Sequence, residues 1–177
     1  MIGWLLALAA PSRAGASDAE AVRLRAEMED LAARTSWKGV DTAYRQLDAL
    51  KGAEPTYDDH VLGALAARQL GEVNDAWWRL KRAAALDGTE EVYTEIALLE
   101  AYYGPVDLVV SKHWRDPIAL EALDPPFEAV PRAVIERARL TLDDAHRYQG
   151  LLPLGRYDLS GVAFEVIGGP EVKAKRR

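Results

Sequence analysis

The sequence predicts a mainly helical α+β protein, in which a short stack of helical hairpins is followed by a small β-sheet with one helix. Apolar residues recur at helical spacing from about residue 18 to residue 104. After Gly104 the pattern changes to short runs rich in β-branched residues, which are typical of strands. One further helical pattern, from Pro131 to about Tyr148, interrupts these runs.

Composition limits the class of protein. The chain has 177 residues, 49% of them hydrophobic, which is enough for one good core or two modest ones. Its formal net charge of -6 argues against nucleic-acid binding, because phosphate contacts need a basic face. The chain has no cysteine, so disulfides and thiolate metal sites are excluded. Basic residues cluster in segment 171–177, which we interpret as a solvated tail, with contact to a membrane surface or a partner as the alternative.

Residues 1–16 are typical of a signal peptide. Residues 2–10 form an apolar run of the length of a signal-peptide core, and residues 14–16 supply the small residues that signal peptidase requires. The run is shorter than the roughly 20 residues that span a bilayer, so no stable membrane span is expected after processing. This interpretation places the mature protein in the periplasm or outside the cell. Because no basic residue precedes the apolar run, a hydrophobic N-terminal helix in a cytoplasmic protein is the alternative.

Residues 17–104 are expected to form a helical domain. The periodicity predicts helices at about residues 18–34, 39–51, 57–70, 74–86 and 90–103. Gly52, Gly71 and Gly104 lie at the breaks between helices, where glycine commonly ends a helix. The third helix is rich in glycine and alanine, which allow neighbouring helices to approach closely.

Small residues also recur at a fixed period in these helices. Within residues 57–88, Ala64 lies on the first predicted helix, and Ala76 and Ala83 lie on the second. Ala43 lies one repeat length before Ala76, and Ala97 lies one repeat length after Ala64. On these residues the segment resembles a tetratricopeptide repeat, a helical hairpin of about 34 residues. A generic helical bundle with chance spacing is the alternative.

The resemblance implies a stack, partly matched over residues 37–108, that binds another protein. In tetratricopeptide repeats the groove-facing residues belong to the first helix of each pair. Carried over by register, these partner-binding candidates are Asp58, Val61, Leu65, Arg68, Gln69, Thr94, Leu98 and Tyr102. Trp78 is a further candidate, because it cannot share the core-facing side of its helix with the adjacent Trp77. A stack this short has a shallow groove, so docking by a whole face is equally compatible with it.

Residues 105–170 are expected to form a small α/β domain that caps the stack. Strands are predicted at residues 106–110, at residues 118–123 and in a terminal hairpin that turns at residues 160–161. We expect the first strand and the hairpin to share one sheet. The segment LPLGRYDL, residues 152–159, resembles the L-P-x-G-x-Y element of small prealbumin-like β domains, such as PEGA and carboxypeptidase-regulatory-like modules. Those domains lack a helix at residues 131–148, so this helix would be an insertion.

No motif for catalysis, cofactor binding or metal binding is found, so the protein is interpreted as non-enzymatic and without a cofactor. The three histidines lie in different predicted elements, with no second ligand at metal-binding spacing. The sequence therefore favours an interaction or scaffold protein of the bacterial cell envelope. Its partner would be another protein of an envelope complex, with self-association left open. The alternative is an accessory protein that binds glycan or peptidoglycan through exposed aromatic residues, with Trp114 as the stacking candidate.

Overall fold

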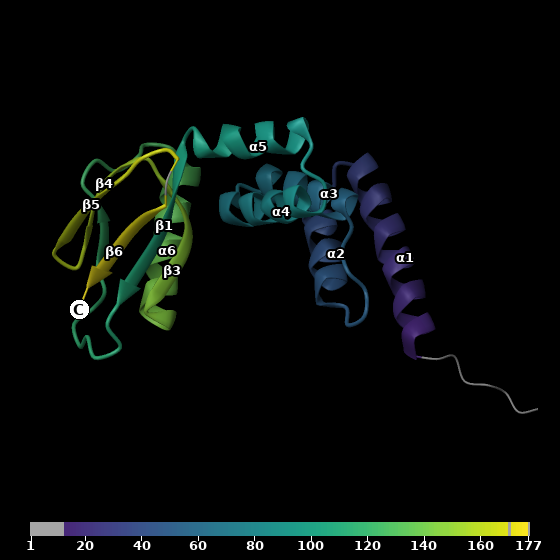
Figure 1. Cartoon of the computed structure of the whole chain (residues 1–177), viewed down its shortest axis with the longest axis horizontal. Helices are drawn as coiled ribbons and strands as arrows, with labels where there is room; N and C mark the ends of the chain where they lie inside the picture. The colour runs from purple at the N-terminus through teal and green to yellow at the C-terminus, as the bar shows by residue number, and fades with distance from the viewer. Residues whose placement is uncertain (1–12, 170, 177) are drawn as a thin grey trace, which may run out of the picture.

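A computed structural model describes residues 13–169 and 171–176 of the chain. Within them lie helices α1 to α6 and strands β1 to β6, an α+β arrangement that confirms the predicted fold class. Helices α1 to α5 lie at one end of the molecule, and the strands with α6 lie at the other (Figure 1). The predicted apolar core of a signal peptide, residues 2–10, lies outside the described residues.

Among the first five helices, each of α1 to α4 packs on the next one along the chain. Their bounds are α1 (Arg13–Ala33), α2 (Trp37–Ala49), α3 (Tyr57–Gln69), α4 (Val73–Leu86) and α5 (Glu90–Glu100). These bounds lie close to the predicted ranges, except that α1 begins earlier and α5 ends earlier. Helix α5 stops at Glu100 because Tyr103 already begins the first strand.

Helix α3 lies between two hydrophobic cores. Ala66 belongs to the core formed with α1 and α2, whereas Ala64 and Ala67 belong to the core that continues into α4 and the strands. Gly63 is also buried, and a Cβ atom added there would lie 2.4 Å from Cδ2 of Tyr44. The small residues of α3 therefore allow helices to pack closely on two of its sides.

The strands form two small sheets. In the first, β1 (Tyr103–Val110) pairs with β3 (Arg147–Pro153) in antiparallel and with β6 (Val172–Arg176) in parallel orientation. In the second, β4 (Gly155–Leu159) pairs in antiparallel orientation with β2 (Leu120–Ala122) and β5 (Val162–Val166). The predicted terminal hairpin is confirmed as β4 and β5. The expectation that it shares a sheet with residues 106–110 is wrong, because β1 pairs instead with two strands that were not predicted.

The first of these strands, β3, begins within the range predicted for the preceding helix. Helix α6 (Ala129–Ala145) ends before the predicted Tyr148. His146 takes a positive φ of 55° and donates its backbone N–H to the carbonyl of Leu142 at 2.9 Å, which closes the helix. The chain then enters β3 at Arg147. A single residue in the left-handed conformation thus decides where the helix ends.

The second strand, β6, corrects the interpretation of residues 171–177 as a solvated tail. Ala174 is buried and Val172 half-buried, whereas Lys173 and Lys175 are exposed. This alternation of apolar and charged residues is typical of an edge strand with one face on a core. The signal was present in the sequence, but the basic charges concealed it.

Helices and sheets share one continuous core across the predicted boundary at residues 104–105. Asn74, on α4, makes a polar link between them: its Oδ1 accepts from the backbone N–H of Leu151 at 2.6 Å, and its Nδ2 donates to the Tyr148 hydroxyl at 2.9 Å. Gly150 leaves room for this side chain, since a Cβ atom there would lie 2.4 Å from Asn74 Oδ1. The strands are therefore packed directly on the helical stack.

Candidate functional site

A pocket of about 150 Å³ opens between α3 and α5, over the inner face of α4. We call it the α3–α5 pocket. Its apolar lining comes from α3 and α4, and α5 contributes carboxylates; the residues are Val61, Ala64, Leu65 and Arg68 of α3, Ala76 and Leu80 of α4, and Glu91 and Glu95 of α5. Small side chains at Ala64 and Ala76 leave the space that makes the pocket. It is therefore an apolar depression with charged groups on its walls.

The charges around the α3–α5 pocket leave one carboxylate unmatched. Arg68 forms an ion pair with Glu95 across the pocket, joining α3 to α5. Glu91, one helical turn before Glu95, is exposed and forms no ion pair with a described residue. The pocket therefore combines an apolar floor with an excess negative charge on the α5 side.

The structure places some of the predicted partner-binding residues together and separates others. Val61, Leu65 and Arg68 line the α3–α5 pocket, and Leu65 is 40% exposed. Leu98 is 48% exposed and follows Glu91 and Glu95 at helical spacing, so it continues the same side of α5. The remaining candidates are exposed but do not line this pocket; they are Asp58 and Gln69 of α3, Thr94 of α5, and Tyr102 in the turn after α5.

A second, polar cleft lies between α2 and α4, and Trp78 is one of the residues that line it. Its volume is about 380 Å³. Trp78 is 41% exposed and meets Trp77 edge to face, with the ring centroids 4.7 Å apart. Trp77 is buried and donates its indole N–H to Glu100 at 2.9 Å. The prediction that only one of these adjacent tryptophans faces the core is confirmed, and Trp78 lies away from the α3–α5 pocket.

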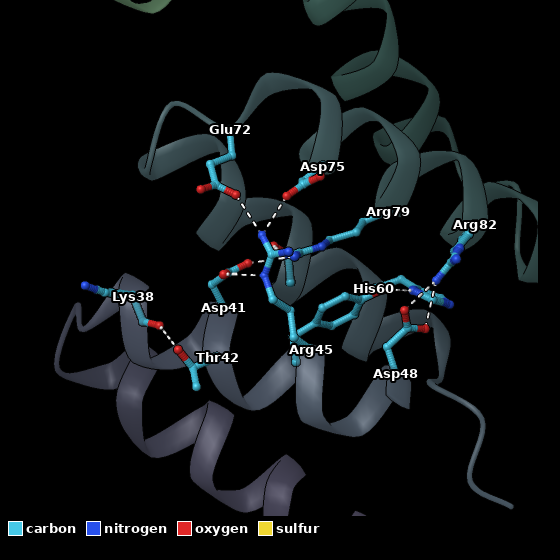
Figure 2. Close-up of polar contacts among 12 residues, drawn as sticks. Lys38, Asp41, Thr42, Arg45, Asp48, His60, Glu72, Asp75, Arg79 and Arg82 are labelled. Atoms are coloured by element: carbon cyan, nitrogen blue, oxygen red, sulfur yellow. Dashed lines mark hydrogen bonds and ion pairs between the residues drawn. The ribbon is translucent and has the colours of Figure 1, made fainter. Parts of the chain in front are cut away.

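The floor of this cleft is an ion-pair network that sequence reasoning missed (Figure 2). Asp41 accepts hydrogen bonds from Arg79 at 2.6 Å and from Arg45 at 2.8 Å. Arg45 reaches on to Asp75 at 2.6 Å and Glu72 at 2.8 Å. Since Asp41 and Arg45 belong to α2 and the other groups lie on α4 or at its N-cap, the network joins these two helices.

The pKa values in this network respond to burial and to the close charges. Burial, together with the neighbouring carboxylate of Asp75, raises the pKa of Glu72. Hydrogen bonding to Asp41 and Asp75 raises the pKa of Arg45, so its positive charge is held firmly. Arg79 also donates to the Gly63 carbonyl at 2.6 Å, which ties α3 to the same network.

Tyr44 and His60 extend the network toward α3. The Tyr44 hydroxyl and His60 Nδ1 lie 2.8 Å apart, and the Arg79 guanidinium lies 4.1 Å from the centroid of the Tyr44 ring. Burial, with a contribution from the charge of Asp48, raises the pKa of Tyr44. Burial, with a contribution from the charge of Arg82, lowers the pKa of His60. His60 is therefore held neutral in a buried hydrogen bond.

Glu72 of the α2–α4 network also pairs with Arg137 of α6, at 3.8 Å. Each arginine of the network has a carboxylate partner, with Arg82 bound to Asp48 at 2.8 Å. Among the described residues, no group of three or more histidines and carboxylates is arranged to hold a metal ion. We therefore interpret the network as a connection between helices, and the α3–α5 pocket as the candidate binding site.

Trp114, the candidate for stacking on a glycan, packs at the edge of the sheet core. The guanidinium of Arg176 lies 4.5 Å from the centroid of its ring. Its indole nitrogen is buried and has no hydrogen-bond partner among the described residues. One face of the ring is thus already covered by a side chain of β6.

The fold and the pocket define an α+β protein with a helical stack, an apolar pocket within that stack and two small sheets packed on its end. No protein-family model matches the sequence, and no curated protein or solved structure matches it significantly. The resemblances to tetratricopeptide repeats and to prealbumin-like domains therefore stay predictions. None of the helices in the described residues is long and apolar enough to cross a membrane.

Proposed function

We propose that the protein is a non-catalytic interaction or scaffold protein that binds a segment of a partner protein at the α3–α5 pocket. The observation that carries this proposal is the exposure of Leu65 beside a pocket with an apolar floor. Exposed aliphatic side chains around a concave apolar site are typical of sites that receive a partner's side chain. The location in the cell envelope rests on residues 1–16 alone and is part of the same proposal.

The charges around the pocket support a partner of defined chemistry. On the α5 side Glu91 has no ion-pair partner among the described residues, while Arg68 is already neutralised by Glu95. A complementary segment therefore carries an aliphatic side chain for the pocket and a lysine or arginine that reaches Glu91. A pocket of about 150 Å³ accommodates one such aliphatic side chain, so the rest of the contact must come from the surrounding face, including Leu98.

The alternative, glycan binding at Trp114, has less support. Stacking on a sugar needs an open aromatic face, whereas Arg176 covers one face of Trp114. The protein-partner proposal is therefore preferred.

The proposal is tested by affinity purification from the native host with the wild-type chain and with a Leu65→Glu/Leu98→Glu variant. The two introduced carboxylates add negative charge to the apolar surface, so we expect the variant to lose the partner while its circular dichroism is unchanged. Leu140→Glu is a matched control, because Leu140 is similarly exposed but lies on α6. Equal capture by the wild type and the double variant would contradict the assignment of the pocket.

A second variant tests the chemistry of the partner. Glu91→Lys reverses the unpaired charge without touching the apolar floor. Peptides selected from a random library against the wild type should contain an aliphatic residue near a lysine or arginine, and Glu91→Lys should weaken their binding by roughly fivefold to tenfold. Selected peptides that bind Glu91→Lys as tightly as the wild type would exclude the electrostatic part of the proposal.

A further inference from the structure

A pocket lined by basic residues lies at the C-terminal end of β1. Its volume is about 620 Å³, and we call it the basic pocket. The polar side chains that line it come from the loop after β1, from the end of α6 and from the outer strands; they are Ser111, Lys112, His146, Arg147 and Lys175. None of the described residues that line it is acidic. In a chain with a net charge of -6, this is a local concentration of the opposite sign.

Strand register explains how Arg147 and Lys175 come together on the two sides of Val109. Val109 of β1 pairs with Arg147 of β3 on one side and with Lys175 of β6 on the other. Directly paired residues point to the same face of a sheet, so both basic side chains rise from one row. Lys112, just beyond the end of β1, adds a third basic residue at the same edge.

The charges within the basic pocket are not equally neutralised. Arg147 binds both carboxylate oxygens of Asp107, at 2.9 and 3.0 Å, which fixes its guanidinium in place. Lys173, the next exposed residue of β6, pairs with Glu171 at 3.5 Å. Lys112 and Lys175, in contrast, form no ion pair with a described residue. Two lysine charges are therefore available to a ligand.

His146 supplies a further polar group. Its backbone is held in the left-handed conformation at the end of α6. Its Nδ1 atom is buried and has no hydrogen-bond partner among the described residues. Buried polar atoms without a partner are uncommon in folded proteins.

We propose that the basic pocket binds the phosphate group of an anionic ligand through Lys112 and Lys175. Lysine ammonium groups bind phosphate as point charges, and the hydroxyl of Ser111 is a further hydrogen-bond donor at the pocket. The phosphate belongs either to a free phosphorylated molecule or to a lipid headgroup, which share this chemistry. The site is separate from the α3–α5 pocket and does not depend on the proposed function.

The test uses the isotopically labelled full chain titrated with inorganic pyrophosphate at low salt and followed by NMR. We expect saturable shifts concentrated at the backbone amides of Lys112, His146 and Lys175. The Lys112→Gln/Lys175→Gln variant should bind at least about tenfold more weakly. Lys173→Gln is the matched control, because it removes a lysine that lies on the same strand and face but outside the pocket. The affinity of this control variant for pyrophosphate should stay within about twofold of the wild type.

A second arm identifies the source of the phosphate. Sedimentation with phosphatidylcholine vesicles that contain phosphatidylglycerol, compared with pure phosphatidylcholine vesicles, detects a headgroup site. Binding to the anionic vesicles that the double variant loses would assign the lipid source, and pyrophosphate binding alone would assign a free phosphorylated ligand. Absence of saturable binding in both arms, or equal binding by the double variant, would overturn the site.

Discussion

Arg79 donates to the carboxylate of Asp41 at 2.6 Å, and both side chains are buried between α4 and α2. The charges lie 38 positions apart in the sequence and meet only because the two helices pack together. A buried charge is costly unless it is paired, so the burial of each of these two charges depends on the presence of the other. Substitutions at this pair therefore test how much the buried ion pair stabilises the packing of α2 on α4.

Asp41→Ala should destabilise the protein by about 3 to 5 kcal/mol, because it leaves the buried guanidinium of Arg79 without its carboxylate. Urea unfolding followed by circular dichroism measures the change. Asp48→Ala is the control: it removes an ion pair with Arg82 that is largely exposed, so its cost should stay below about 1 kcal/mol. The double variant Asp41→Leu/Arg79→Met should recover most of the lost stability. Similar losses for Asp41→Ala and Asp48→Ala would show that burial does not set the energy of this pair.

Gly63→Ala should destabilise the protein by about 1 to 3 kcal/mol, because the added methyl group meets the ring of Tyr44. The same substitution should cost much less in a Tyr44→Ala background, where the obstructing ring is gone. Thermal unfolding of the wild type, both single variants and the double variant gives the coupling energy, expected to be at least about 0.5 kcal/mol. Strictly additive losses would mean that α2 and α3 adjust their spacing without contact at this site.

The neutral His60 should make stability depend on pH. Its pKa is lowered from 6.5 in the folded protein, chiefly by burial, so the unfolded chain binds more protons as the solution is acidified. The contribution of neutral His60 to the free energy of unfolding is therefore fully present above about pH 6.5. It is lost as the pH falls toward the pKa of His60 in the folded protein, and it does not change further below that pKa. His60→Gln should remove this loss. The measurement is the difference in unfolding free energy between wild type and His60→Gln at pH 7.5 and near pH 5. A difference that does not change with pH would exclude His60 as the titrating group.

The sequence was a reliable guide to the helices but less so to the strands. The bounds of α2, α3 and α4 lie close to their predicted ranges, because their apolar residues recur at helical spacing and a glycine follows each helix within a few residues. Strand β3 alternates only over residues 147–150 before a continuous buried run, and its pairing depends on hydrogen bonds from Asn74 and β1. Strand β6 does alternate, but four basic residues at the chain end favoured a solvated tail instead.

The lining of the α3–α5 pocket was predictable only for residues that share one helix. Val61, Leu65 and Arg68 follow from helical spacing along a single element, and the structure places them on one pocket. The network of Asp41 and Arg79 has no local signal, since each residue taken alone is an ordinary helix residue. Likewise, the register that brings Arg147 and Lys175 to the two sides of Val109 depends on pairing between distant strands.

The local order of this protein can therefore be read from its residues alone: helical periodicity, glycine breaks, acidic balance and the lack of thiol chemistry. Which strands pair, which charges are buried and where the pockets open depend on contacts between elements that are distant in the chain. The physical reason is that periodicity records which face of an element avoids water, but not which partner covers that face. Lys175 makes this distinction plain: the sequence showed its charge, and the parallel pairing of β6 with β1 placed that charge in a pocket.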